Sequence, residues 1–214
     1  MTNYESDKEV QIANENIEKV TKYKYLGQNT VFENKTKEEV AIRIRNAWFA
    51  FGKYRDIFQD KDLPMTLKKR VFNQSILPIM TYGCQTWSLT KELSSKLQTT
   101  QRSMERKMLN IRLQDKVPCT TIRQKTGVTD VLKHALTQKW NWAGHIARYS
   151  DNRWTKRCTD WRPRNGFRTA GRPTKRWRDD IGKHAGITWH RKAQERKKWR
   201  LSVEGYIQQW MDNA

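Results

Sequence analysis

The sequence predicts a mainly α-helical protein that begins with a short β-hairpin. Apolar residues recur every three or four positions in several segments, a spacing that places them on one face of a helix. Residues that favour helix ends border these segments, with Thr90 before one of them and Gly127 after another. Near the N-terminus, by contrast, two short stretches flank the turn sequence Asn14-Glu15-Asn16, which favours a hairpin.

The predicted hairpin pairs residues 10–13 with residues 17–26. A two-stranded hairpin is only marginally stable by itself, so we expect it to be the least stable element. The following helix should begin at a capping box, in which Thr36 is the cap and Glu39 reaches back, and should end near Phe58. Its apolar side contains Val40, Ile44, Ala47, Trp48 and Phe51, and its solvated side contains Arg43, Lys53 and Arg55.

Residues 63–112 predict two helices joined by an apolar and aromatic elbow. Pro64 suits the first position of the first helix, where a missing N–H costs nothing, and Pro78 should kink or end that helix. The corner is expected at Tyr82-Gly83-Cys84, with Trp87 packed beside it. The apolar side of the first helix contains Leu67, Val71, Ile76, Leu77, Ile79 and Met80.

Thr90 should cap the second helix of this stretch. Apolar side chains three, four or seven residues apart form a seam on it that must pack against another element. This seam consists of Leu93, Leu97, Met104, Met108 and Ile111. Ser95, Arg102 and Arg106 are expected to project from the opposite side of the helix.

Beyond Arg112 the sequence predicts a loop and then a short helix that ends at Gly127. A longer helix should follow from about Thr129 to about Tyr149, with much of its aromatic area in the core. Its apolar face contains Leu132, Leu136, Ala143 and Ile146, flanked by Trp140 and Trp142. Two helices separated by a glycine also fit a helix-turn-helix DNA reader, and the sequence leaves that alternative open.

The last quarter of the chain combines turn residues with dense positive charge. We expect a loop near residues 150–172, followed by helices over residues 173–184 and 189–211. Trp199, Val203, Tyr206, Ile207 and Trp210 form the apolar side of the last helix. Cations crowd its start, where they oppose the helix macrodipole, which favours either an external anion or a solvated face. They are Arg191, Lys192, Arg196, Lys197, Lys198 and Arg200.

The charge of the chain indicates a polyanionic partner. It carries 43 Lys plus Arg against 22 Asp plus Glu, a formal net charge of +21. Residues 1–63 hold 11 Lys/Arg and 11 Asp/Glu, whereas residues 151–200 hold 17 and 5. The second region is therefore the expected nucleic-acid surface. No run of about 18 apolar residues exists, so no membrane partner is expected.

The three cysteines, Cys84, Cys119 and Cys158, are far apart and odd in number. This pattern argues against a disulfide framework and favours a reducing compartment, the nucleus or the cytoplasm. A zinc site would have to be assembled from Cys119, Cys158 and the four His residues, without the C-x-x-C pair that anchors structural zinc sites. We therefore predict no metal and no cofactor.

Several motifs carry a family resemblance. The string ILPIMTYGCQTWSLTKE, residues 76–92, followed by a basic helix, resembles the thumb of reverse transcriptases of non-LTR retrotransposons. Tyr23-Lys24-Tyr25-Leu26-Gly27 resembles the strand that closes the polymerase palm before the thumb. Residues 142–148 (WAGHIAR) and 171–177 (GRPTKRW) resemble tail motifs of the same proteins. The motifs occur in the family's order over most of the chain. The resemblance implies the end of a palm at residues 1–30, a helical thumb at 31–127 and a basic helical region at 128–214.

The same resemblance implies that this chain has no polymerase site of its own. The family holds two metal ions on paired Asp residues of a palm hairpin. The only Asp-Asp pair here, Asp179-Asp180, lies in a basic and helical context, where it is expected to balance Arg176, Arg178 and Lys183. The chain begins just downstream of where the palm carboxylates and the endonuclease would lie, which suggests a truncated fragment. We predict no catalytic residue and no activity of the chain alone.

The expected function is to hold nucleic acid by its backbone, as the family's thumb holds the template–primer duplex. The expected partners are an RNA template, an RNA–DNA hybrid or a DNA duplex, and a separate palm-containing polypeptide. Alternatives are a stand-alone nucleic-acid-binding or architectural protein, a polymerase or nuclease with an unrecognised site, and the non-functional product of a decayed element. The predicted contact residues are Arg102, Arg106, Lys107, Arg112, Lys139, Arg148, Arg172, Lys175, Arg176 and Arg178, with Trp177 as a stacking residue and His145 near Arg148.

Overall fold

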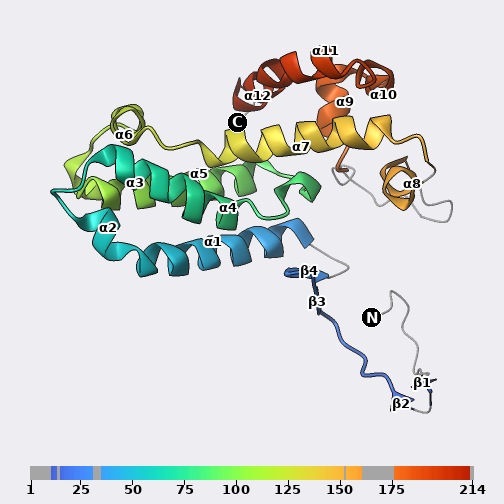
Figure 1. The fold of residues 1–214 in the computed structure, drawn as a ribbon, viewed down its shortest axis with the longest axis horizontal. Helices are drawn as coiled ribbons and strands as arrows, with labels where there is room; N and C mark the ends of the chain where they lie inside the picture. The colour runs from blue at the N-terminus through green and yellow to red at the C-terminus, as the bar shows by residue number, and fades with distance from the viewer. Residues whose placement is uncertain (1–10, 14, 31–34, 152, 161–175, 213–214) are drawn as a thin grey trace.

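One long helix, α7 (Val131–Arg148), runs through the middle of the molecule (Figure 1). The computed structural model describes residues 11–13, 15–30, 35–151, 153–160 and 176–212. Helices α1, α4 and α5 lie on one side of α7, and α9 to α12 lie on the other (Figure 1). The mainly helical fold class is therefore confirmed.

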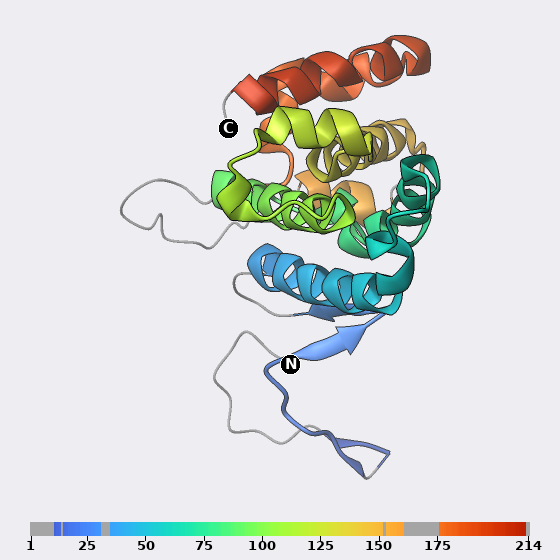
Figure 2. The same ribbon diagram turned by 90° about the vertical axis from the view of Figure 1, so that its left-hand side faces the viewer.

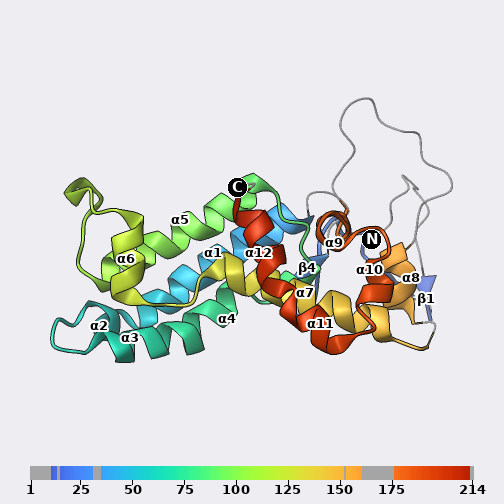
Figure 3. The same ribbon diagram turned by 90° about the horizontal axis from the view of Figure 1, so that it is seen from above.

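The helices before α7 are α1 (Lys35–Lys53), α2 (Arg55–Gln59), α3 (Met65–Val71), α4 (Leu77–Met80), α5 (Lys91–Met108) and α6 (Cys119–Thr126). Those after it are α8 (Trp154–Asp160), α9 (Asp179–Ala185), α10 (Trp189–Lys192), α11 (Arg196–Leu201) and α12 (Val203–Asp212). A π-helical turn, η1 (Phe72–Ile76), and two 3₁₀ turns, η2 (Cys84–Thr86) and η3 (Leu113–Asp115), complete the order. Seen from above, α11 and α12 cross over α7 (Figure 3).

The N-terminal strands form two short hairpins, so the single hairpin predicted from the sequence is wrong. Strand β1 (Gln11–Ile12) pairs with β2 (Glu15–Asn16), and β3 (Tyr23–Tyr25) pairs with β4 (Gln28–Thr30), both antiparallel. Leu26 and Gly27, between β3 and β4, both have positive φ angles, 48° and 75°. Such angles belong to a two-residue hairpin turn, which folds the second stretch back on itself. The β3–β4 hairpin lies beneath α1 in Figure 2.

A charged pair, and not a capping box, occupies the start of α1. Glu39 accepts a hydrogen bond from the backbone N–H of Asn29 in β4 and another from Arg43, at 3.0 Å. Arg43 also donates to the carbonyl of Gly27, and only 7% of its surface is exposed, which corrects the expectation of a solvated side chain. Thr36 accepts from the backbone of a later segment instead of capping its own helix. Of the two predicted cap residues, Glu39 therefore connects α1 to the β3–β4 hairpin, and Thr36 connects it to the elbow at Ser88.

The apolar side of α1 lies where it was predicted, with Val40, Ala47 and Phe51 buried and Ile44 and Trp48 packed against the core. Lys53 and Arg55 are exposed, as expected. The helix stops at Lys53 and continues as α2, so the end predicted near Phe58 falls in α2. The Phe58 ring of α2 stacks on the Phe51 ring of α1, with centroids 4.4 Å apart, so the two helices share one core.

The elbow contains a π-helical turn that the sequence did not reveal. Pro78 has no N–H to donate to the carbonyl four residues earlier, and its ring crowds that carbonyl. The chain widens into η1 just before the proline and resumes as α4 around it, so Pro78 interrupts the regular helix as predicted. The chain then turns at Gly83, whose φ of 73° lies in the left-handed region, as expected for the predicted corner. Leu67, predicted on the apolar side, is 41% exposed.

Helix α5 has the predicted cap and most of the predicted seam, but it ends at Met108, so Ile111 lies beyond the helix and is half-buried. The Thr90 hydroxyl accepts from the N–H of Leu93 at 3.3 Å. Leu93, Leu97, Met104 and Met108 are buried. Helix α6 ends at Gly127, which is left-handed with φ 57°, as predicted. Helix α7 is capped by Asp130, whose side chain accepts from the N–H of Lys133.

Nothing in the position of α7 points to the helix-turn-helix alternative. A recognition helix must present one free face to the major groove of DNA. Helix α7 instead packs against α5 on one side and against α11 and α12 on the other. The exposed and half-buried residues of α7 are confined to the remaining stripe, which includes His145 and Arg148.

The C-terminal part is more segmented than predicted. Helix α8 lies where a loop was expected, and its Asp160 is tied to Arg178 at 3.2 Å and to His190 at 3.3 Å. The expected helix over residues 189–211 is divided into α10, α11 and α12. Residues ten positions apart on one regular helix point about 80° apart. The interruption lets Trp189 and Trp199, both buried, turn toward the same core. Of the predicted helix over residues 173–184, α9 forms the end, and residues 161–175 lie outside the described residues.

Candidate nucleic-acid interface

The Asp-Asp pair is part of the fold and not of a metal site. Asp180 is buried and pairs with Lys139 at 2.9 Å. It also accepts a hydrogen bond from the Tyr206 hydroxyl at 3.3 Å. Burial, together with the Asp180 carboxylate, raises the pKa of Tyr206 well above its usual value, so the phenol stays protonated. Asp179 accepts the backbone N–H of Arg176. The structural role was predicted correctly, but the partners expected for Asp180 were wrong.

Lys139 and Trp177, predicted as contact residues, are both engaged in contacts within the protein, Lys139 buried and Trp177 half-buried. Lys139 is 2% exposed and donates to the carbonyl of Trp87 at 3.0 Å as well as to Asp180. The indole N–H of Trp177 donates to the carbonyl of Gln85 at 2.7 Å. The Lys139 ammonium lies 5.3 Å from the centre of the Trp177 ring. These contacts connect α7, η2 and α9, and they leave Lys139 out of reach of a phosphate.

Arg102 is likewise neutralised by the protein. Its guanidinium pairs with Glu105 at 2.6 Å and with Asp130 at 3.0 Å, and its side chain is 11% exposed. Arg123 joins the same two carboxylates, at 3.5 Å and 3.0 Å. The expectation that Arg102 projects away from the packed side of α5 is wrong. We call these four residues the α5–α6 network.

The other predicted contact residues lie at the surface or outside the described part of the chain. Arg106 is half-buried, with a nitrogen 3.5 Å from the sulfur of Cys119. The Lys107 ammonium lies 5.0 Å from the centre of the Trp48 ring. Arg112 and Arg176 are exposed, and Arg178 is paired with Asp160. Arg172 and Lys175 fall in residues 161–175, which the structure does not describe.

Four cationic or titratable side chains gather where α7 meets α11, and we call them the α7–α11 cluster. They are His145 and Arg148 of α7 and Arg196 and Arg200 of α11. Burial, Arg148, Arg196 and Arg200 together lower the pKa of His145. Burial and the same two arginines of α11 lower the pKa of Arg148. Among the described residues, no salt bridge links any of the four to a carboxylate. The cluster is therefore a concentration of positive charge that the described residues leave unneutralised.

The position of α11 on α7 is fixed by two tryptophans. The Trp140 and Trp199 rings are stacked with centroids 3.9 Å apart. Each indole N–H donates to the other residue's carbonyl, at 2.8 Å and 2.9 Å. Gly144 permits this approach, because a Cβ atom there would lie 2.6 Å from the Trp199 Nε1. Arg148 donates at 2.8 Å to the carbonyl of Ala193, the residue that ends α10 shortly before α11 begins. The cluster is thus built on a rigid base.

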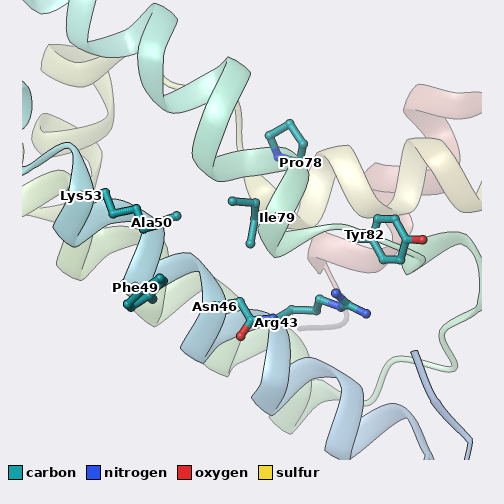
Figure 4. A pocket seen from close by; sticks show the side chains of 8 residues that line it. All are labelled: Arg43, Asn46, Phe49, Ala50, Lys53, Pro78, Ile79 and Tyr82. Carbon is teal, nitrogen blue, oxygen red and sulfur yellow. The ribbon is translucent and has the colours of Figure 1, made fainter. Parts of the chain in front are cut away.

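A groove of about 490 Å³ between α1 and α4 is the other notable surface feature (Figure 4). Its lining is mostly apolar, and it includes the exposed rings of Phe49 and Tyr82. Lys53 lies 4.8 Å from the centre of the Phe49 ring, and Arg43 lies 4.6 Å from that of Tyr82. Because Arg43 is already paired with Glu39, the groove offers little free charge to a polyanion. The α7–α11 cluster is the stronger candidate.

The cysteines do not form a metal site with other described residues. Cys84 is buried, and burial raises the pKa of its thiol to about 12. Cys119 and Cys158 are exposed. In the described ranges, no group of three or more His, Cys, Asp or Glu side chains could hold a metal ion. No helix of that part of the chain is both long and apolar enough to cross a membrane.

A relative in Caenorhabditis elegans shows to which family the chain belongs. This uncharacterized transposon-derived protein is 34% identical over 199 residues, which cover 86% of the present chain and 70% of the relative. The chain belongs to the family of this transposon-derived protein. No model of a known protein family matches, and no solved structure matches. The predicted origin in a transposable element is confirmed at this level.

Sequence reasoning singled out Arg148 with His145 nearby but did not include Arg196 and Arg200 among the contact residues. A signal for them was present, since both belong to the group of cations at the start of the predicted last helix. What the sequence lacked was the break before α11 and the contact of Trp199 with Gly144. Those two features bring the arginines of α11 beside the end of α7.

Proposed function

We propose that this member of the transposon-derived family is the end of the palm, the thumb and the basic tail of a non-LTR retrotransposon reverse transcriptase. In this proposal the chain binds the template–primer backbone and has no catalytic site of its own. The ordered motifs and the transposon-derived relative support the origin. The structural role of Asp180 supports the lack of a polymerase site in the described residues, because its carboxylate is already engaged with Lys139 and Tyr206.

The α7–α11 cluster is the observation that carries the binding function. Like charges held together raise the free energy of the folded protein unless an anion joins them. A nucleic-acid backbone supplies phosphates at regular spacing and releases counterions when cations replace them. Such contacts position a duplex without reading its sequence, and an RNA–DNA hybrid is recognised by its shape and backbone. The exposed Arg112 and Arg176 are further phosphate contacts in this proposal.

The hairpins support a second partner, a palm-containing polypeptide. Tyr23 and Tyr25 of β3 are 57% and 61% exposed, and β3 pairs only with β4 among the described strands. A two-stranded sheet with exposed aromatic side chains is poorly stable in water, and additional strands would cover it. In the proposal these strands belong to a palm.

The test is the salt dependence of binding to an RNA–DNA hybrid. If about six phosphates are neutralised, the logarithm of the affinity should fall with the logarithm of salt at a slope near −5. A variant with both Lys53 and Arg55 changed to Ala should keep that slope, because these residues lie in a charge-balanced region. A slope near zero would contradict the proposal. A roughly thousandfold preference for one sequence would instead favour a stand-alone architectural protein.

Catalysis provides a separate check. The protein should not extend a primer on an RNA template with nucleotides and Mg²⁺ or Mn²⁺, because the carboxylate of Asp180 is buried and paired. Extension by the pure protein, abolished by Asp179→Asn, would reveal a polymerase site and overturn this part of the proposal.

A further inference from the structure

We propose that the surface at the C-terminal end of α7 binds single-stranded nucleic acid, with unpaired bases stacked on Tyr149 and Trp154 and phosphates held by the α7–α11 cluster. This inference rests on the proposed function, and it adds to the duplex-backbone contacts of the cluster a site for an unpaired stretch of nucleic acid. It starts from the aromatic side chains that lie next to the cluster, which a duplex partner leaves without a role.

Aromatic rings extend the cluster along α7. The Trp142 ring centre lies 6.4 Å from that of His145 and 6.5 Å from that of Tyr149. Residues 142, 145 and 149 are three and four positions apart, so they share one face of the helix. The Arg153 guanidinium lies 4.8 Å from the centre of the Tyr149 ring. Cations and rings therefore alternate from α11 across the end of α7.

Helix α8 adds the most exposed ring of this surface. Trp154 is 75% exposed, and the Arg157 guanidinium lies 5.3 Å from its ring centre. Helix α8 begins five residues after Tyr149, and the Lys156 ammonium donates to the Tyr149 carbonyl. In Figure 1, α8 lies on one side of the C-terminal end of α7 and α11 lies on the other. A strand crossing that end would meet both.

The chemistry of the surface favours an unpaired strand. A duplex presents its phosphates but hides the faces of its bases, so the exposed Trp154 ring and the half-buried Tyr149 ring gain little from it. A single strand offers both, and aromatic stacking of its bases is tolerant of sequence. The charge is complementary as well, because Asp151, paired with Arg153, is the only carboxylate with a described contact to Arg153 or to the α7–α11 cluster.

The experiment compares three probes of the same length with the full chain at one salt concentration. They are a single-stranded oligothymidine, an abasic single strand with the same number of phosphates, and a DNA duplex. The oligothymidine should bind at least about tenfold more tightly than the abasic strand, because only the former can stack. Trp154→Ala should remove most of that difference and leave duplex binding unchanged. Since Trp154 is exposed, its replacement should not unfold the protein.

Two control variants test whether the effect comes from base stacking at position 154 and not from the loss of any exposed aromatic ring. Trp154→Phe should retain most of the preference for oligothymidine. Phe49→Ala removes another exposed ring with a cation above it, 4.8 Å away, on distant α1, and should change nothing.

Equal affinity for the oligothymidine and the abasic strand would overturn the inference while leaving the proposed function intact. So would a Trp154→Ala variant that weakens all three probes equally. Absence of salt-dependent binding to every probe would instead overturn the proposed function.

Discussion

Two groups of arginines in this protein have opposite surroundings. In the α5–α6 network, Arg102 and Arg123 share the carboxylates of Glu105 and Asp130. In the α7–α11 cluster, Arg196 and Arg200 lie close enough to Arg148 to lower its pKa, and no described carboxylate pairs with any of the three. The first group joins helices together. The second stores repulsion that an external anion can relieve.

The comparison shows that local charge density does not identify a binding surface. Arg102 and Arg148 both lie on long helices with an apolar seam and were predicted as contact residues for the same reason. What separates them is the acidic residue that tertiary structure brings to one and not to the other. Glu105 lies one helical turn from Arg102, and Asp130 arrives from the cap of α7.

The largest expected effect is on the α5–α6 network. Glu105 is 0% exposed and also accepts a hydrogen bond from Thr126 at 3.0 Å. Glu105→Ala should lower the free energy of unfolding by about 3–5 kcal/mol, because it leaves two arginines facing a buried gap. Urea unfolding measures this. The control is Glu92→Ala on the same helix, whose solvent-exposed pair with Lys96 should contribute far less to the free energy of unfolding. Equal losses in the two variants would contradict the structural role of the network.

The second effect is on binding. Replacing Arg196 and Arg200 together with Ala should make the salt dependence of duplex binding shallower by about two units, one for each lost phosphate contact. The stability of the free protein should not fall, because both side chains are exposed. The matched variant, Lys53→Ala with Arg55→Ala, removes the same charge from α1 and α2. A similar change of slope in both double variants would mean that total charge, and not the cluster, attracts the nucleic acid.

The third effect is a pH dependence of stability and of nucleic-acid binding that arises from protonation of His145. In the free protein its pKa is lowered from 6.5 by burial and by Arg148, Arg196 and Arg200. Folding therefore excludes a proton, and the stability that this residue contributes above pH 6.5 should be lost as the pH falls below that value. Bound phosphates should raise the same pKa, so that binding takes up a proton and tightens as the pH falls.

The measurement is the difference between the protein and His145→Gln in a series of binding titrations from pH 7.5 to pH 5.5. Other histidines contribute equally to both proteins and cancel. Parallel pH profiles would show that His145 does not face the bound anion.

The smallest effect has the opposite sign from the first. Arg200→Ala should stabilise the free protein by a few tenths of a kcal/mol at low salt, because Arg196 and Arg200 are like charges four residues apart on one helix. The gain should vanish in about 1 M salt, where charges a few ångströms apart are screened. Thermal unfolding at two salt concentrations would reveal it. A loss of stability would mean that Arg200 has a structural partner.

Much of the helical framework followed from the sequence because its signals are local. Thr90, Gly83 and Gly127 act through their own backbone or hydroxyl groups, and each lies where it was predicted. The seam of α5 and the apolar side of α1 follow from helical periodicity, which needs no knowledge of the partner. Trp140 and Trp199 were expected in the core for the same reason.

The errors came from contacts between distant segments. The Thr36 and Glu39 pattern fits a cap, but β4 and the elbow compete for both side chains. Three cations that the sequence placed at the surface are paired with carboxylates in the fold. Arg43 pairs with Glu39, Arg102 with Glu105, and Lys139 with Asp180. Arg196 and Arg200 became a candidate site only because the last helix breaks and turns α11 onto α7. Periodicity cannot locate such breaks, since they depend on which rings share a core.

The contact between α7 and α11 depends on glycine at position 144, so it is sensitive to a single substitution there. The two nearest atoms to a methyl group at that position would belong to the Trp199 ring, at 2.6 Å and 2.7 Å. Copies of a mobile element accumulate substitutions, and one methyl group here would lift α11 away from α7 while leaving every arginine in the sequence. Copies that retain the cluster should therefore keep glycine at position 144, or change positions 144 and 199 together. A copy with alanine at 144 and tryptophan at 199 would retain its full positive charge without the surface that this charge forms.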